Sequence, residues 1–230
     1  MVRPRLLDLF CGQGGAARGY DRAGFDVTGV DIDDQPRYPF QFIRADALTF
    51  LADGGAAGFD VVHASPPCQA YSVTKATHSK THPKLVGPVR AALVATGLPY
   101  VIENVVGAPL MGALILCGTE FHLTATDDDG RVIALKRHRL FESNVFLMGA
   151  GGCCCGDIRG RVGGVYGGGS SDRRHARHVR RGGYTPSKAV RAELLGIDPD
   201  AMTLHGQAQA IPPAYTAFIG AQLLAHLVPT

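Results

Sequence analysis

Short apolar runs alternate with helix-like stretches along the first half of this 230-residue chain, and this alternation constrains its fold more than any other feature. The runs expected to be strands are RLLDLF, FDVTGVDID, FQFIRADAL, FDVVHASPP and PYVIENV. Strands that alternate with helices predict a parallel sheet that is covered by helices on both faces. We therefore expect an α/β chain with a Rossmann-like, doubly wound sheet.

Polar side chains gather where these runs end. The residues concerned are Asp8, Asp31, Asp46, Cys68 and Glu103. In doubly wound sheets, ligands bind beyond the carboxyl ends of the strands. Their shared placement therefore indicates a site more strongly than any one motif does.

The second half of the chain has a different amino-acid composition. Residues 143–204 are rich in glycine and arginine, and we expect irregular loops over a basic surface there. Within this stretch, SKAVRAELLGI predicts a helix that begins at Ser187 and ends at Gly196. The segment IPPAYTAFIGAQLLAHL predicts an apolar helix entered through Pro212-Pro213. In the first half of the chain, PKLVGPVRAALVATG predicts another helix before the fifth strand.

The composition is that of a globular chain with a sizeable core, since 46% of the residues are hydrophobic and 19% are charged. No apolar run approaches the roughly 18–20 residues of a membrane span, and the N-terminus does not resemble a secretory signal. We expect a cytoplasmic protein with reduced cysteines and no membrane partner. The net charge of +3 is compatible with a polyanionic partner, and seven arginines lie between Arg159 and Arg181.

The glycine-rich turn in DLFCGQGG follows the first run and opens a helix, so that its backbone amides can approach a ligand. Asp31 follows about 20 residues later, where an acid can hold ribose hydroxyls. Asp46 ends the third run, where it could accept a hydrogen bond from an adenine amino group. So many carboxylates disfavour a pyrophosphate and favour S-adenosylmethionine. In the alternative interpretation, Asp31 and Asp46 only cap helices.

Three further motifs carry candidate catalytic groups. Cys68 follows a Pro-Pro corner at the expected cleft, where a thiolate could act as a nucleophile, although a lone cysteine is more often structural. Glu103 ends an apolar strand, where a buried acid is costly unless it binds something; with Asn104 it could read a pyrimidine or merely shape a turn. Arg137 and Arg139 in KRHRLFES suit a phosphate or a carboxylate, but such pairs are often only solvated.

The run Cys153–Cys155 raises the possibility of zinc. Metal sites normally have two or more residues between ligands, because adjacent cysteines point in different directions. Cys117, His175 and His178 could complete such a site, but nothing in the sequence fixes their geometry. We therefore assign no metal ligand from the sequence.

Taken in order, these motifs resemble those of the DNA (cytosine-5)-methyltransferase family, and most closely its short phage and actinobacterial members. The resemblance covers 1–142 and 205–230. It is carried by LDLFCGQGG, VDID, RADAL, SPPCQAYS, VIENV, the RHR of KRHRLF, and QAIPPAYTAFIGAQLL. The Pro-Pro-Cys-Gln sequence is highly specific.

The resemblance implies the S-adenosylmethionine-dependent methyltransferase fold with a small irregular insertion: a catalytic domain at 1–142, a short target-recognition-like segment at 143–204, and a motif at 205–230 that returns to the catalytic domain. It implies S-adenosyl-L-methionine as the cofactor and, as the partner of a monomer, double-stranded DNA with a flipped cytosine. The implied catalytic residues are Cys68, Glu103, Arg137 and Arg139. The implied cofactor-binding residues are Phe10, Gly12, Gln13, Gly14, Asp31, Ile32, Asp46, Ala47, Pro67, Gln209 and Ile211. The implied DNA contacts, in or beside a lid over the flipped base, are Gln69, Ser72 and Thr74.

The chain departs from the family pattern at three places. Gln209 stands where the family usually has asparagine, and Leu135-Lys136 replaces a glutamine that commonly precedes the Arg-x-Arg pair. The segment 143–204 is short for a recognition domain, and arginines bind phosphates without reading sequence, so we expect short or relaxed specificity. Alternatives are an RNA or tRNA cytosine-5 methyltransferase, a catalytically weak DNA-binding homologue, and a zinc-dependent regulator built on 143–204.

Overall fold

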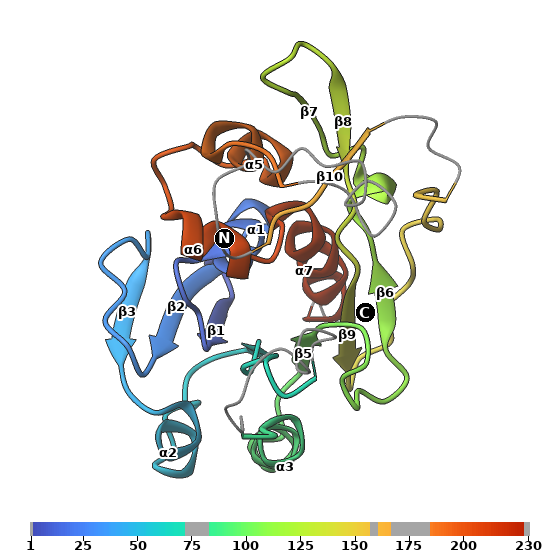
Figure 1. The fold of residues 1–230 in the computed structure, drawn as a ribbon. Coiled ribbons are helices and arrows are strands. Elements are labelled where there is room, and N and C mark those ends of the chain that lie inside the picture. Colours follow the sequence, from blue (N-terminus) through green and yellow to red (C-terminus); the bar gives the residue numbers. More distant parts are fainter. Residues whose placement is uncertain (1, 72–82, 157–160, 167–184, 228–230) are drawn as a thin grey trace.

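The computed structural model describes residues 2–71, 83–156, 161–166 and 185–227. Its main sheet has seven strands in the order β3-β2-β1-β4-β5-β9-β6 (Figure 1). The strands are β1 (Arg5–Leu9), β2 (Asp26–Asp31), β3 (Gln41–Arg44), β4 (Val61–Ala64), β5 (Tyr100–Asn104), β6 (Leu114–Leu116) and β9 (Arg139–Ser143). The five predicted apolar runs contain β1 to β5, so these strand predictions are confirmed.

The first five strands are parallel, and the sheet turns antiparallel only at its far edge. β1 lies between β2 and β4, with Asp8 opposite Gly29 on one side and His63 on the other. β9 runs antiparallel to β5 and to β6. All residues of β4 and β5 are buried, as expected for central strands covered on both faces.

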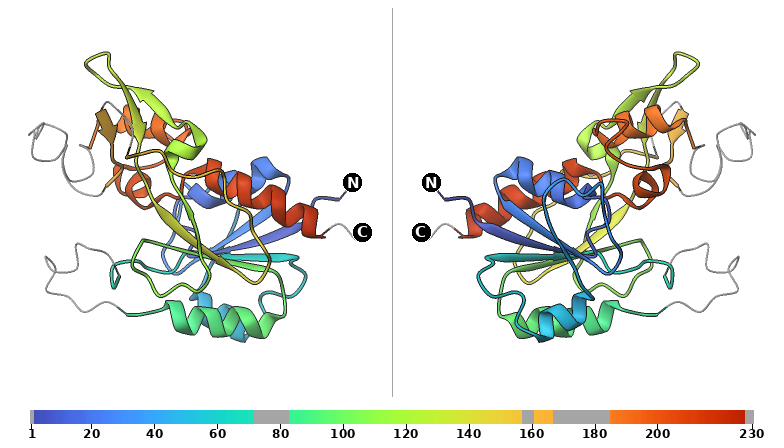
Figure 2. Two further views of the ribbon diagram at one scale, coloured as in Figure 1. Left: turned by 90° about the vertical axis from the view of Figure 1, so that its right-hand side faces the viewer. Right: turned by 90° about the vertical axis from the view of Figure 1, so that its left-hand side faces the viewer.

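Helices cover both faces of the sheet (Figure 2). α1 (Gly15–Ala23) and α7 (Pro213–Leu227) lie on one face, and α2 (Ala47–Ala52) and α3 (Val86–Thr96) lie on the other. Each pair closes its own hydrophobic core against the sheet. This is the doubly wound arrangement that the alternation of runs predicted.

α1 and α7 approach each other closely because glycine lies between them. A Cβ on Gly19 would come 2.0 Å from Thr216 Oγ1 and 2.1 Å from the carbonyl oxygen of Pro213. The Thr216 hydroxyl donates a hydrogen bond to the carbonyl oxygen of Ala16 at 2.8 Å. This contact fixes α7 over the first turns of α1, next to the glycine-rich loop.

A second, three-stranded sheet has the order β10-β8-β7. Its strands are β7 (Thr124–Thr126), β8 (Val132–Leu135) and β10 (Arg161–Gly163); the 3₁₀ helix η2 (Gly118–Phe121) precedes it in the chain, and α5 (Lys188–Leu195) and α6 (Leu204–Gln209) follow. Its core joins Ile133 and Leu135 to Val165, Leu194 and Met202. This core draws residues from both sides of position 143, so the expected boundary at that position does not divide the cores. Within the described part of 143–204, the strand β10 was not predicted from the sequence.

The predicted helix ends are confirmed in this region. Ser187 is the N-cap residue of α5, and Gly196 ends the helix in a left-handed conformation with φ 69°. The Ser187 hydroxyl bonds to Asp128 instead of the helix, at 3.1 Å. α7 begins at Pro213, as the Pro-Pro entry predicted. None of the helices in the described residues is both long and apolar enough to span a membrane.

Candidate functional site

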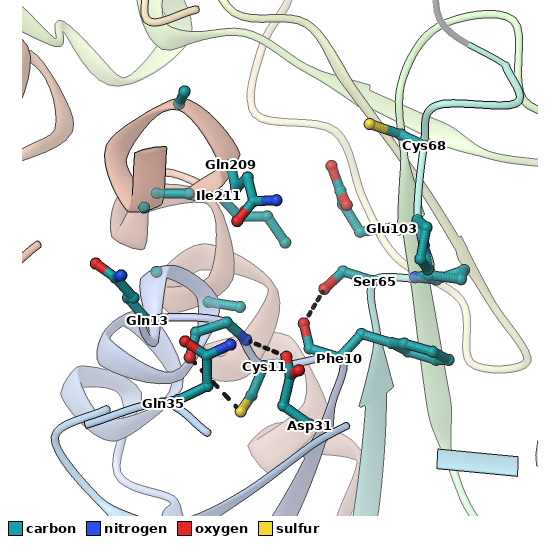
Figure 3. A pocket seen from close by; sticks show the side chains of 18 of the residues that line it. Phe10, Cys11, Gln13, Asp31, Gln35, Ser65, Cys68, Glu103, Gln209 and Ile211 are labelled. Atoms are coloured by element: carbon teal, nitrogen blue, oxygen red, sulfur yellow. Dashed lines mark hydrogen bonds between the residues drawn. The ribbon is translucent and has the colours of Figure 1, made fainter. Parts of the chain in front are cut away.

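A cavity of about 420 Å³ opens at the carboxyl ends of β1, β2, β4 and β5, within the size range of small-molecule sites (Figure 3). α6 and the two residues that follow it close the cavity from the opposite side. Its lining includes Phe10, Gly12, Gln13, Asp31, Ile32, Ser65, Pro67, Cys68, Gln69, Glu103, Arg139, Gln209 and Ile211. The structure therefore brings most of the predicted cofactor and catalytic residues into one site.

The glycine-rich loop is held in an unusual backbone conformation. Phe10, Gly12 and Gly14 all have positive φ angles, of 59°, 50° and 81°. Glycine adopts such angles readily, whereas a phenylalanine there is strained, and strain of this kind gathers at binding sites. Asp31 stabilises the loop, since its Oδ2 accepts a hydrogen bond from the Gly12 amide at 2.9 Å.

Gln13 ties the same loop to the far wall of the cavity. Its Oε1 accepts a hydrogen bond from the Thr203 amide at 2.9 Å, and its Nε2 donates to the Thr203 hydroxyl at 3.1 Å. Thr203 in turn caps α6 through the amide of Gly206. A Cβ on Gly206 would come 2.1 Å from Gln13 Oε1, so this contact requires glycine. Gln13 thus positions the wall that carries Gln209.

Hydrogen bonds before, within and after the Pro-Pro corner hold the loop that carries Cys68. Asn104 Nδ2 donates to the carbonyl oxygen of Pro66 at 2.9 Å, and the Ser65 hydroxyl donates to the carbonyl oxygen of Phe10 at 3.3 Å. The Tyr71 amide closes a turn onto the carbonyl oxygen of Cys68 at 2.9 Å. These bonds fix the thiol relative to both the glycine-rich loop and β5.

Cys68, Glu103 and Arg139 converge at one end of the cavity. Arg139 Nε lies 3.0 Å from Glu103 Oε1, and the Glu103 side chain is buried. Burial raises the pKa of Glu103, although the charge of Arg139 opposes this shift. Burial also raises the pKa of the Cys68 thiol, Glu103 raises it further, and Arg139 lowers it. The free site therefore holds Cys68 mainly as a thiol at neutral pH.

Arg137 does not line this cavity, although its charge lowers the pKa of Cys68 and Glu103, and its predicted catalytic role stays a prediction. Its side chain is only 2% exposed, and its guanidinium donates to the carbonyl oxygens of Val165 at 2.5 Å and Ala208 at 2.7 Å. Burial lowers its pKa to about 9. Alternate residues on an extended segment share a face, but here the segment lies between two cores, and Arg137 joins them instead of reaching the cavity.

Three other predicted cofactor residues lie outside the described lining: Gly14, Asp46 and Ala47. Asp46 is the N-cap of α2, and its Oδ1 accepts from both the amide and the hydroxyl of Thr49 at 2.9 Å. These bonds lower the pKa of Asp46. For Asp46, the structure thus shows the helix-capping role that the sequence left open. Of the predicted DNA contacts, Gln69 lies exposed at the cavity, and Ser72 and Thr74 lie outside the described residues.

Asp8 lies beneath the glycine-rich loop, inside β1, and not at the cavity. It is fully buried, and its Oδ2 accepts a hydrogen bond from the Tyr38 hydroxyl at 3.4 Å. Burial raises the pKa of Asp8 to about 8. On β4, burial lowers the pKa of His63 to about 3, and its Nδ1 lies 2.9 Å from the Tyr20 hydroxyl. Asp8 and His63 are therefore both neutral at pH 7.

The sequence missed several residues that line the cavity, among them Gln35, Ser65, Val105, His205 and Ala208. Ser65 and Val105 directly follow β4 and β5, so their position beyond a strand end was a usable signal. Gln35, His205 and Ala208 reach the site only through tertiary packing, which no local pattern encodes.

The charge of the lining is predominantly acidic. The described lining residues include three carboxyl groups, those of Asp31, Asp33 and Glu103, and one guanidinium, that of Arg139. Ile32 adds an apolar side chain that is 62% exposed. Such a cavity favours a cationic ligand with an apolar ring over a polyphosphate.

Comparisons with known proteins agree with this geometry. The chain is 33% identical over 124 residues to the type II methyltransferase M.XorII of Xanthomonas oryzae pv. oryzae, a match covering 46% of this chain and 29% of that relative. The chain therefore spans less than a third of the curated relative that it matches. No protein-family model matches the chain.

Solved structures show the same fold at low sequence identity. The S. pombe Dnmt2 methyltransferase superposes with a TM-score of 0.61 at 14% identity, covering 98% of this chain and 99% of that one. An E. coli prophage protein assigned as a DNA modification methyltransferase gives a TM-score of 0.57 at 14% identity, covering 97% and 99%. The Entamoeba histolytica methyltransferase EhMeth gives 0.58 at 12%, covering both chains fully.

The chain thus has the S-adenosylmethionine-dependent methyltransferase fold that the sequence predicted. The similarity to a type II methyltransferase agrees with the resemblance that the order of the motifs indicated.

Proposed function

We propose that this chain transfers a methyl group from S-adenosylmethionine to C5 of a cytosine in DNA, with Cys68 as the nucleophile. The observation that carries the proposal is the convergence of Cys68, Glu103 and Arg139 at one end of a cavity whose other end is formed by the glycine-rich loop and Asp31. One cavity thus joins a nucleophile to a nucleoside site. The similarity to M.XorII supports methyl transfer, and the similarity to the prophage protein supports DNA as the substrate.

The donor end of the cavity fits S-adenosylmethionine. Asp31 accepts from the amides of Gly12 and Asp33 and retains further lone pairs for ribose hydroxyls. Phe10 and Ile32 offer apolar surface to an adenine ring. The acidic lining suits a sulfonium cation. Gln209 and Ile211, on the opposite wall, would close over the donor. When bound, the donor supplies an electrophilic methyl group.

Cytosine C5 is a poor nucleophile. Cys68, Glu103 and Arg139, at the end of the cavity that would receive the cytosine, would activate it. The Cys68 sulfur would attack C6 after its thiol proton is lost, and the electron pair would move to C5. Glu103, whose pKa is raised by burial, would hydrogen-bond N3 and share a proton with it while the ring accepts charge. Arg139 would hold Glu103 and stabilise the adduct. After C5 takes the methyl group, loss of its proton to a base would expel the Cys68 thiolate and restore the ring.

The acceptor must reach the thiol as an unpaired base. C6 of cytosine is inaccessible within a stacked duplex, so the target nucleotide would have to rotate out at a cost of a few kcal/mol. Gln69, exposed beside Cys68 at the cavity, would contact the DNA around that base. We propose that the short segment 143–204 gives short or relaxed sequence specificity.

The test is methyl transfer by the purified full chain with labelled S-adenosylmethionine, offered unmethylated genomic DNA or unmodified tRNA. Wild type should methylate cytosine C5 in DNA, and Cys68→Ala should abolish transfer. Cys154→Ser is the matched control, because Cys154 is exposed and lies outside the cavity. Donor binding is measured separately by calorimetry.

The outcomes separate the alternatives. Transfer to tRNA but not to DNA would replace the proposed substrate with RNA. Donor and DNA binding without transfer would indicate a catalytically weak DNA-binding homologue. Full activity of Cys68→Ala would overturn the proposed mechanism.

A further inference from the structure

Three separate segments bring sulfur and imidazole side chains together outside the cavity. Cys117 follows β6, His138 precedes β9, and Cys153 and Cys155 lie in the glycine-rich segment after β9. The ligand atoms of these four residues all lie within 4.8 Å of one another. All the cysteines involved are free thiols. None of these four residues lines the cavity described above.

The spacing within the cluster is close to that of a tetrahedral zinc site. His138 Nε2 lies 3.3 Å from Cys153 Sγ and 3.7 Å from Cys155 Sγ. A zinc ion with Zn–S bonds of about 2.3 Å and Zn–N bonds of about 2.0 Å separates its ligand atoms by about 3.5–3.8 Å. Small side-chain adjustments therefore suffice to bring all four ligand atoms to bonding distance from one ion.

Neighbouring donors are arranged around the sulfur atoms. The Thr119 hydroxyl lies 3.5 Å from both Cys117 Sγ and Cys153 Sγ, and the Cys155 amide donates to Cys153 Sγ at 3.3 Å. Hydrogen-bond donors beside metal-bound thiolates stabilise their negative charge. Cys117 is fully buried, which fixes one ligand in place before an ion arrives.

We propose that Cys117, His138, Cys153 and Cys155 bind one structural zinc ion. Three thiolates and one imidazole suit zinc and not magnesium or calcium, which prefer oxygen ligands. Four protein ligands fill a tetrahedral shell, so no position remains for a substrate. On binding, three sulfur–zinc bonds and one nitrogen–zinc bond form, and the three thiol protons pass to solvent.

The proposed site also resolves the objection raised by three adjacent cysteines. Neighbouring cysteines point apart, and the cluster uses Cys153 and Cys155 while leaving out Cys154. The two ligands therefore come from alternate positions of the run, with Cys154 exposed between them.

The ion would fix a segment that has little core of its own. Gly151 and Gly152 have φ angles of 112° and 101°, and residues 151–154 are exposed. Zinc would fasten this segment to Cys117 at the end of β6 and to His138 at the start of β9. The backbone oxygen of His138 accepts a hydrogen bond from Arg139 Nη1 at 2.9 Å, so the ion would also steady the arginine that pairs with Glu103.

The first experiment measures metal content by mass spectrometry on full chain purified without chelators from zinc-supplemented cells. Wild type and Cys154→Ser should each carry one zinc per chain. Cys117→Ser, Cys153→Ser, Cys155→Ser and His138→Ala should each lose most of it. Wild type without zinc after reconstitution, or loss of zinc from Cys154→Ser equal to that from Cys153→Ser, would overturn the proposal.

A second measurement avoids variants that fail to fold. Wild-type protein is alkylated with iodoacetamide before and after zinc is removed with a chelator, and each cysteine is located by peptide mapping. Zinc should protect Cys153 and Cys155 but leave Cys154 reactive in both states. A disulfide between Cys153 and Cys155 in freshly purified protein, or equal reactivity in both states, would contradict the proposal. Because neither experiment measures methyl transfer, the zinc proposal can fail without affecting the proposed function.

Discussion

The main sheet and the small sheet differ in what holds them together. The main sheet has two hydrophobic cores, one per face, built from central strands and close helix contacts. The small sheet has one short core, and it depends as well on single polar contacts such as those of Arg137. We infer that extensive apolar packing positions the glycine-rich loop and Asp31, whereas individual side chains position the opposite wall of the cavity.

The largest expected effect comes from breaking the packing of α1 against α7. Gly19→Ala should lower the free energy of unfolding by about 3 kcal/mol, because the added methyl group would overlap Thr216 and the Pro213 carbonyl. Urea denaturation measures this change. Gly87→Ala is the matched control, since Gly87 lies in α3 with open space around it and should be unchanged or stabilised by about 0.5 kcal/mol. Equal stability of the two variants would contradict the proposed role of this contact.

A smaller effect should separate the two arginines of the Arg-x-Arg pair. Arg137→Met should lower the free energy of unfolding by about 2 kcal/mol, because two buried carbonyl oxygens lose their charged donor. Its methyl transfer per folded molecule should stay near that of wild type.

Arg139→Met is the counterpart of Arg137→Met and should behave in the opposite way. It should reduce the rate of transfer about a hundredfold, because the Glu103 partner and the adduct lose their cation. Paired denaturation and rate measurements on both variants check this. Similar losses of rate in the two variants would show that Arg137 acts in catalysis after all.

The buried Asp8 should make the stability of the main sheet depend on pH. The unfolded chain loses this proton near the usual 3.8, whereas the folded chain retains it to about 8, so unfolding releases a proton between these values. Rising pH therefore favours unfolding, by up to about 1.4 kcal/mol per pH unit. Asp8→Asn should flatten the dependence measured by urea denaturation between pH 5 and pH 8. An identical slope in wild type and variant would show that Asp8 is ionised in the folded chain.

The smallest expected effect is a shift in the titration of Cys68. Its alkylation by iodoacetamide should rise with pH to a midpoint above the usual thiol pKa of 9.0. Glu103→Gln should lower that midpoint, because the carboxylate charge raises the pKa of Cys68. Peptide mapping identifies the alkylated cysteine. An unchanged midpoint would show that Glu103 does not act on the thiol electrostatically.

The sequence predicted the main sheet well because its information is local. Apolar runs, the glycine-rich loop and the Pro-Pro-Cys-Gln motif each specify a nearby structure, and Asp31, Cys68 and Glu103 meet because the ends of parallel strands meet. Asp8 and Asp46 show the limit of this reasoning. Both were expected at the ends of strands that meet a ligand, yet Asp8 is buried inside β1 and Asp46 caps α2.

The small sheet could not be predicted in the same way, because its contacts join distant segments. Arg137 bonds to Val165 and Ala208, and Cys117 approaches Cys153 only after β6 and β9 pair. Neither arrangement leaves a periodic pattern in the sequence. The core of the small sheet crosses the boundary expected at residue 143 for the same reason.

The most direct test of the central claim is covalent trapping on a DNA duplex that contains 5-fluorocytosine, with S-adenosylmethionine present. Fluorine at C5 cannot leave as a proton does, so elimination of the thiolate is blocked after methyl transfer. We predict a complex that survives denaturation, with the base attached to Cys68 in the peptide map, and no complex with Cys68→Ser. Attachment at another cysteine, or no complex from wild type that binds both donor and duplex, would contradict the account.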